Sequence, residues 1–183
     1  MEREGMHPYP RFRPVLKVAL LYLVFMGLYG LYRVLPIFPF SLICGTCEST
    51  FQHFKATFFT FLIVDLIEYL VLRKKIVAGG QFWNGRLLLA TFSPWLVFLL
   101  WYIVPALYGK LPTIAAEIIY SNIITLLVMV CGVMLESGFL QIPFSRPQKI
   151  LIWFFLLVSL MLFMVFTYSH LPWADVFIEA NWK

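Results

Sequence analysis

The stretch from Cys44 to Lys55 gathers reactive side chains in an otherwise apolar chain. It reads CGTCESTFQHFK, whereas 62% of the whole chain is hydrophobic. Cysteine, histidine and carboxylate side chains can ligate a metal, relay protons or form a redox pair. The C-x-x-C spacing alone leaves four interpretations open: inert thiols, a structural disulfide, redox catalysis, or a metal site at Cys44, Cys47 and His53.

Two residues of this stretch have a structural explanation, and two others do not. Ser49 and Gln52 fit the S-x-x-Q capping box, which predicts a helix that begins there. Glu48 and His53 are not explained in this way, and they could act as acid and base on a lipid. We rank such an enzyme last, because the chain shows no nucleophile motif or nucleotide-binding loop.

Composition indicates the class of protein that carries this stretch. Of the 183 residues, 13% are charged and 19% are aromatic, and the mean hydropathy is +0.87. A soluble domain carries about 25% charged residues. A soluble fold of this length could not bury so much apolar surface, so the surplus must face lipid. The net charge of +5 does not indicate nucleic-acid binding, because the basic residues flank apolar segments.

Five apolar segments are long enough to cross a hydrocarbon core of about 30 Å as helices. They are residues 15–35, 51–72, 87–108, 112–135 and 150–170. Prolines within the third segment are tolerable where neighbouring helices satisfy the freed carbonyl groups. We predict an all-α integral membrane bundle of five transmembrane helices. Residues 1–14 are the predicted cytoplasmic tail, 15–170 the membrane domain and 171–183 an external interfacial tail.

Basic residues predict the orientation of the bundle. When the loops alternate across five spans, ten Lys and Arg residues fall on the N-terminal side and four on the other. The ten are Arg3, Arg11, Arg13, Lys17, Arg73, Lys74, Lys75, Arg86, Arg146 and Lys149. Because basic residues collect on the cytoplasmic side, this predicts an N-terminus inside and a C-terminus outside.

The predicted topology brings ionisable residues from distant segments toward the outer face. The candidate ligand-binding residues are Glu48, His53, Lys55, Asp65, Glu117 and His170. Asp65 lies about 14 residues, or ~21 Å, below the outer end of its helix. Intramembrane carboxylates are functional candidates, and for Asp65 the structural and functional interpretations weigh equally. For Glu68 we expect an interfacial ion pair with Arg73 or Lys74.

Residues 48–55 and the following FFTFLIVDLIEYL resemble a family of small prokaryotic multi-pass membrane proteins described as a domain of unknown function. Its hallmark reads N-E-S-x-W-E-H-x-K before an apolar helix that ends in I-E-Y. The chain matches at Glu48, Ser49, His53, Lys55, Ile67, Glu68 and Tyr69, and departs at Cys47, Phe51 and Gln52. The resemblance implies a prokaryotic plasma-membrane protein whose outer-end cluster is a signature. It implies no activity.

These observations favour a binding role over catalysis. We expect an accessory or binding subunit of a membrane complex, whose partners are the lipid bilayer and other membrane subunits, with no nucleic acid. The alternative is a binder or transporter of a small lipophilic ligand, an ion or a metal through the outer-facing site. The residues do not identify a cofactor.

Overall fold

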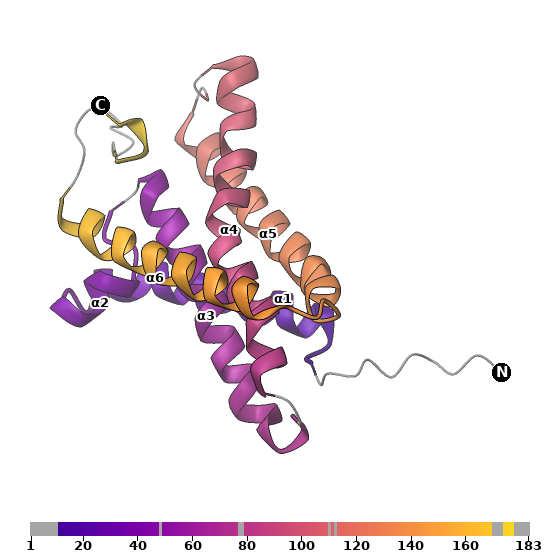
Figure 1. Ribbon diagram of the computed structural model, residues 1–183. Helices are drawn as coiled ribbons and strands as arrows, with labels where there is room; N and C mark the ends of the chain where they lie inside the picture. The colour runs from indigo at the N-terminus through magenta and orange to yellow at the C-terminus, as the bar shows by residue number, and fades with distance from the viewer. Residues whose placement is uncertain are drawn as a thin grey trace.

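A computed structural model describes residues 11–47, 49–76, 79–109, 111, 113–169 and 174–177 of the chain. Within these residues the protein is entirely helical, as Figure 1 shows. The α-helices are α1 (Pro14–Val34), α2 (Phe38–Ile43), α3 (Thr50–Leu72), α4 (Gly79–Tyr108), α5 (Ile114–Phe139) and α6 (Arg146–Tyr168). Two short 3-10 turns are η1 (Arg73–Lys75) and η2 (Asp175–Phe177). The predicted all-α class is confirmed for the described residues.

Four of these helices are long and apolar enough to cross a membrane. They are α1, residues Phe82–Tyr108 of α4, residues Ala115–Phe139 of α5, and α6. They correspond to four of the five predicted spans. The remaining predicted span is α3, which has 23 residues but carries Lys55, Asp65 and Glu68, and so is less apolar than the other four.

The structure contains one helix that was not predicted, and several boundaries differ: α5 ends at Phe139 rather than at residue 135, and α6 begins at Arg146 rather than at residue 150. The short helix α2 was not expected; it forms after Pro36, and Pro39 stands in its first turn, where a proline without an N–H group is tolerated. Helix α4 begins at Gly79 rather than at residue 87. Its early polar residues Asn84 and Arg86 are buried within the bundle, so they continue the helix instead of ending it.

Helix α3 occupies the centre of the bundle. It has twelve buried residues, whereas α1 and α6 have four each. It packs against α4 and α1, while α5 packs against α4 and α1 in turn. Helix α6 packs against α4 and lies across it in Figure 1, whereas α4 and α5 run side by side. Helix α3 is thus mostly buried, and its charged side chains Lys55, Asp65 and Glu68 lie inside the bundle.

Neighbouring side chains allow α4 to continue through Pro94 and Pro105. A proline in a helix leaves the carbonyl group four residues earlier without its usual partner, which for Pro105 is Trp101 O. The single hydroxyl proton of Tyr120 in α5 is shared between Leu100 O at 2.6 Å and Trp101 O at 3.1 Å. The expectation that a neighbouring helix satisfies the freed carbonyl is confirmed at this position.

The described part of the C-terminal tail returns to the bundle. The ring of Phe177 in η2 lies 4.8 Å from the ring of Phe51 and 5.4 Å from that of Phe166, measured between centroids. These contacts join the tail to the first turn of α3 and the last turns of α6. Residues 171–173 and 178–183 of the predicted interfacial tail lie outside the described residues.

Candidate functional site: a buried ionic cluster

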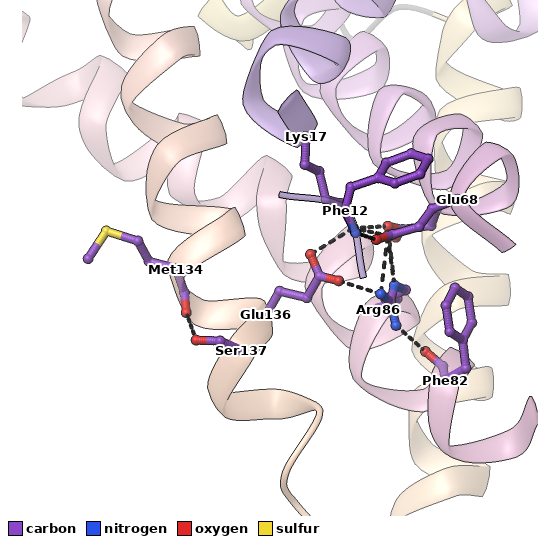
Figure 2. Close-up of polar contacts among 9 residues, drawn as sticks. Phe12, Lys17, Glu68, Phe82, Arg86, Met134, Glu136 and Ser137 are labelled. Atoms are coloured by element: carbon purple, nitrogen blue, oxygen red, sulfur yellow. Dashed lines mark hydrogen bonds and ion pairs between the residues drawn. The ribbon is translucent and has the colours of Figure 1, made fainter. Parts of the chain in front are cut away.

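Five charged side chains from four helices meet inside the bundle. They are Lys17 near the start of α1, Asp65 and Glu68 late in α3, Arg86 in the first part of α4, and Glu136 near the end of α5. Each side chain is at most 2% exposed. We call these five residues the ionic cluster; Figure 2 labels four of them and shows their contacts.

The Lys17 ammonium group lies at the centre of the carboxylates. Its Nζ atom is 2.7 Å from Asp65 Oδ1, 2.7 Å from Glu68 Oε2 and 2.7 Å from Glu136 Oε2. An ammonium group has three N–H donors and no acceptor, so three carboxylate oxygens match its capacity. Lys17 thereby joins α1 to α3 and α5.

The Arg86 guanidinium group contacts the same carboxylates from the side of α4. Its Nη2 atom lies 3.1 Å from Glu68 Oε2 and 2.8 Å from Glu136 Oε1. The Nε atom donates to Glu68 Oε2 at 3.2 Å and lies 3.8 Å from Asp65 Oδ1. The remaining Nη1 donates to Phe82 O at 3.1 Å, and the guanidinium carbon stacks 3.7 Å from the Phe82 ring centre (Figure 2). All parts of this cation are therefore engaged.

The three carboxylates are not equally satisfied. Glu68 uses both oxygens, because Oε2 accepts from Lys17 and Arg86 while Oε1 accepts from the backbone N–H of Phe12. Asp65 accepts from Lys17 through Oδ1, but its buried Oδ2 has no hydrogen-bonding partner among the described residues. Glu136 Oε1 is within ion-pair distance of Arg86 but lacks the alignment of a hydrogen bond. Asp65 Oδ2 is the least satisfied oxygen of the cluster.

This arrangement can bind charge and can hold helices together. The carboxylates of Asp65, Glu68 and Glu136 each offer an oxygen within 4.8 Å of the others, which is close enough to share a cation. The Lys17 ammonium group already contacts all three. Removing one partner of a buried ion pair costs about 3–5 kcal/mol, because the other charge is left uncompensated. Each member of the cluster is thus important for the packing of four helices.

The structure corrects the predicted partner of Glu68. We expected an ion pair with Arg73 or Lys74, but both lie in the exposed turn η1 that follows the helix. Glu68 instead faces the interior and binds Lys17 and Arg86.

Three members of the cluster were missed by the sequence analysis. Lys17 and Arg86 were counted as loop charges, and Glu136 was not considered. The available signal was the pair Asp65 and Glu68, which at a spacing of three residues share a helix face and require cationic partners. Lys17 and Arg86 lie inside helices rather than in loops, and this placed them within reach.

His53 lies at the opposite end of α3 from the cluster, in an aromatic environment. Its ring centre is 4.7 Å from that of Tyr29, 5.5 Å from that of Trp101 and 5.9 Å from that of Phe25. Its Nδ1 atom is buried without a hydrogen-bonding partner among the described residues. The structure therefore does not join His53 to Asp65, and the two form separate polar sites along the same helix.

Lys55 is fully buried at the same end of α3. Its Nζ atom donates to Ser41 O at 2.9 Å and to Thr167 Oγ1 at 3.2 Å. These bonds connect α3 to α2 and α6. The candidate Lys55 is therefore an internal connector in this structure, and its amine is not presented at the surface of the described chain.

The two cysteines of the C-x-x-C pair are free thiols, with Cys44 buried and Cys47 partly buried. Burial raises the pKa of the Cys44 thiol, and the nearby positive charge of Lys55 opposes this effect. Cys47 Sγ donates a weak 3.5 Å hydrogen bond to Ser49 Oγ. Within the described residues Cys44, Cys47 and His53 do not come together as a three-ligand group, whereas the carboxylates of the ionic cluster do.

The predicted capping box at Ser49 and Gln52 is wrong. Ser49 is the N-cap residue of α3, but its side chain makes no capping hydrogen bond. Gln52 Oε1 instead accepts from the backbone N–H of Thr46 at 3.4 Å. The Gln52 side chain thus bonds to the loop before α3. It therefore does not bond to the backbone N–H of Ser49, as the capping box would require.

Glu117 lies apart from both sites, in the first turn of α5. It lines a pocket of about 220 Å³ with Trp101, Pro105, Gly109, Leu111 and Tyr120. Trp101 also packs against His53, so the pocket and the aromatic environment of His53 share a wall. Glu48 and His170, the other two candidates, lie outside the described residues.

Comparisons with known proteins show no relative of this chain. No protein-family model matches it, no curated protein matches it, and no solved structure matches it. The observations that bear on function are therefore those of the chain itself.

Proposed function

We propose that the chain is an integral membrane protein with five spans, in which α3 crosses the membrane in addition to α1, α4, α5 and α6. Helix α3 has 23 residues, or ~35 Å at 1.5 Å per residue, which exceeds a hydrocarbon core of about 30 Å. Its charged residues Lys55, Asp65 and Glu68 are buried by other helices rather than exposed to lipid. A central span can carry such residues, because the surrounding helices satisfy them.

Five spans and the distribution of basic residues favour an N-terminus inside and a C-terminus outside. In this orientation the ionic cluster lies toward the inner side, because Lys17 and Arg86 are near the inner starts of their helices. Glu68 and Glu136 are likewise near the inner ends of theirs. His53, Lys55 and Glu117 then lie toward the outer side.

Within the membrane we propose that the protein serves as an accessory or binding subunit of a membrane complex. The observation that carries this proposal is the ionic cluster, in which buried charges bind one another across four helices. Such a cluster sets the helix arrangement rather than presenting reactive groups to a substrate. The resemblance of residues 48–55 to the uncharacterised membrane family accords with this proposal and adds no activity to it.

Two measurements test the proposal. Reporters that are active on only one side of the membrane, fused before Met1 and after Lys183, should place the termini on opposite sides. Native mass spectrometry after extraction in mild detergent should then detect the chain in a stoichiometric complex with other membrane subunits. Termini on the same side would reject five spans, and a chain that is always alone would reject the accessory role.

A second function, the binding of a small lipophilic ligand, is favoured by the pocket between α4 and α5. Its walls are aromatic and apolar, and Glu117 supplies the carboxylate. This chemistry suits a small organic cation with an apolar body. A lipophilic amine that co-purifies with the wild-type chain should be lost in Glu117→Gln, whereas Glu136→Gln should retain it. An equal amount in the wild type and in Glu117→Gln would reject this site.

A further inference from the structure

The ionic cluster contains more acidic than basic groups. Asp65, Glu68 and Glu136 supply three carboxylates, while Lys17 and Arg86 supply two cations, and all five side chains are at most 2% exposed. Fully ionised, the cluster would hold one uncompensated negative charge inside the bundle. An unpaired buried charge is among the most costly features that a protein can contain. Within the cluster itself, one negative charge therefore has no matching positive charge.

The hydrogen bonds indicate where this charge belongs. Glu68 is saturated on both oxygens by Lys17, Arg86 and the Phe12 backbone. Asp65 Oδ2 is buried and has no hydrogen-bonding partner among the described residues, although Asp65 is only 1% exposed. A buried carboxylate oxygen in a native protein is expected to have a partner. The available position is thus Asp65 Oδ2, and the other incompletely bonded carboxylate is that of Glu136.

The two cations of the cluster, Lys17 and Arg86, limit the charge of an ion that can bind there. The Lys17 ammonium group already lies 2.7 Å from one oxygen of each carboxylate, and the Arg86 guanidinium group contacts the cluster from α4. A divalent ion held by the same three carboxylates would meet strong repulsion from both cations. A single positive charge balances the cluster, whereas two would reverse its sign.

We propose that the ionic cluster binds one monovalent cation, a proton or an alkali-metal ion, at Asp65 Oδ2. The other charged groups of the cluster are Lys17 from α1, Glu68 from α3, Arg86 from α4 and Glu136 from α5. The bound charge neutralises the cluster and so stabilises the contact of the four helices. This site is distinct from the outer pocket at Glu117, and it does not depend on a partner subunit.

Infrared spectroscopy of the purified wild-type protein provides the first test, at neutral pH in a choline buffer free of alkali ions. A bound proton should appear as the carbonyl stretch of a protonated carboxyl group that shifts in D2O and is unaffected by added Na⁺ or K⁺. A bound alkali ion should instead raise the apparent unfolding temperature when Na⁺ or K⁺ replaces choline at equal ionic strength. If the wild type shows neither signal, the proposal is overturned.

Variants test whether Asp65 is the position. Asp65→Asn leaves two carboxylates and two cations, so it should abolish the carboxyl band or the ion-dependent shift. Asp175→Asn, which removes a carboxyl group in η2 outside the cluster, should keep the wild-type signal. If Asp65→Asn does not fold, Glu136→Gln removes the same excess charge and should also lose the signal. A signal of wild-type size in a folded Asp65→Asn or Glu136→Gln variant would contradict the proposed site.

Discussion

Lys17 shows how much depends on a single buried cation. It contacts three carboxylates from two other helices, and its side chain is 2% exposed. Lys74, by contrast, is exposed in the turn η1. The comparison of these two lysines separates the effect of burial and pairing from the effect of charge alone.

Substitution of Lys17 by Met should destabilise the bundle strongly. The change retains much of the side-chain volume but leaves three carboxylates facing one guanidinium group, which should cost about 3–5 kcal/mol. The apparent unfolding temperature in detergent measures this loss. Lys74→Met is the control, since an exposed charge contributes little. Equal unfolding temperatures for the two variants would show that the cluster does not hold the helices together.

The two thiols of the C-x-x-C pair should differ in reactivity. Alkylation requires the thiolate, and burial raises the pKa of Cys44, so at neutral pH a smaller fraction of this thiol is ionised than in an exposed cysteine. We expect maleimide to modify the partly buried Cys47 before Cys44, and modification of Cys44 to accelerate only as the pH rises. Peptide mapping by mass spectrometry measures both rates. Resistance of both cysteines until a reductant is added would indicate a disulfide instead.

At the scale of the elements, α4 and α5 depend on each other through Tyr120. Helix α4 contains Pro105, and the carbonyl group that this proline frees is satisfied from α5. A second close contact joins α3 and α5, where a Cβ atom on Gly132 would lie 2.6 Å from the Phe61 ring. The proline of α4 and the glycine of α5 thus each have a specific partner side chain on the neighbouring helix, in addition to the apolar packing.

Tyr120→Phe should lower the free energy of unfolding by about 1–3 kcal/mol, the cost of leaving a buried carbonyl group unsatisfied. In a Pro105→Ala background, the new backbone N–H can bond to Trp101 O within the helix. The loss caused by Tyr120→Phe should then shrink. A double-mutant cycle of unfolding measurements gives the coupling between the two positions. An identical loss in both backgrounds would show that the hydroxyl does not act through the proline.

At the scale of the whole molecule, many large apolar side chains are exposed, while several charged side chains are buried beside the hydrophobic core. Helix α6 has broad exposed apolar surface, including Leu157 at 55% exposure, beside the buried Leu156 at 8%. Exposed apolar surface of this extent is typical of a chain that is surrounded by lipid or by other membrane subunits.

Tryptophan substitutions at these two neighbouring positions distinguish the surfaces. Leu156→Trp should overfill the interior and cost about 1–3 kcal/mol, whereas Leu157→Trp should change stability by no more than about 0.5 kcal/mol. Both variants are compared by apparent unfolding temperature and by the subunits that co-purify. A stable Leu157→Trp variant that loses its partners would locate the subunit interface on α6. Destabilisation of the isolated chain by Leu157→Trp would mean that this face is internal.

Local properties of the sequence sufficed for the helical class, for four of the five predicted segments as helices long and apolar enough to cross a membrane, and for the position of Asp65 within its helix. Apolar run length and composition depend only on neighbouring residues, and they can be read along the chain. The same reasoning found Asp65 and Glu68 but misjudged their surroundings: it assigned Lys17 and Arg86 to loops, overlooked Glu136, and gave Glu68 the wrong partners. The tertiary structure alone decided which charges meet. That outcome depends on how each helix is rotated about its axis and how far it slides along its neighbours, and long-range packing determines both.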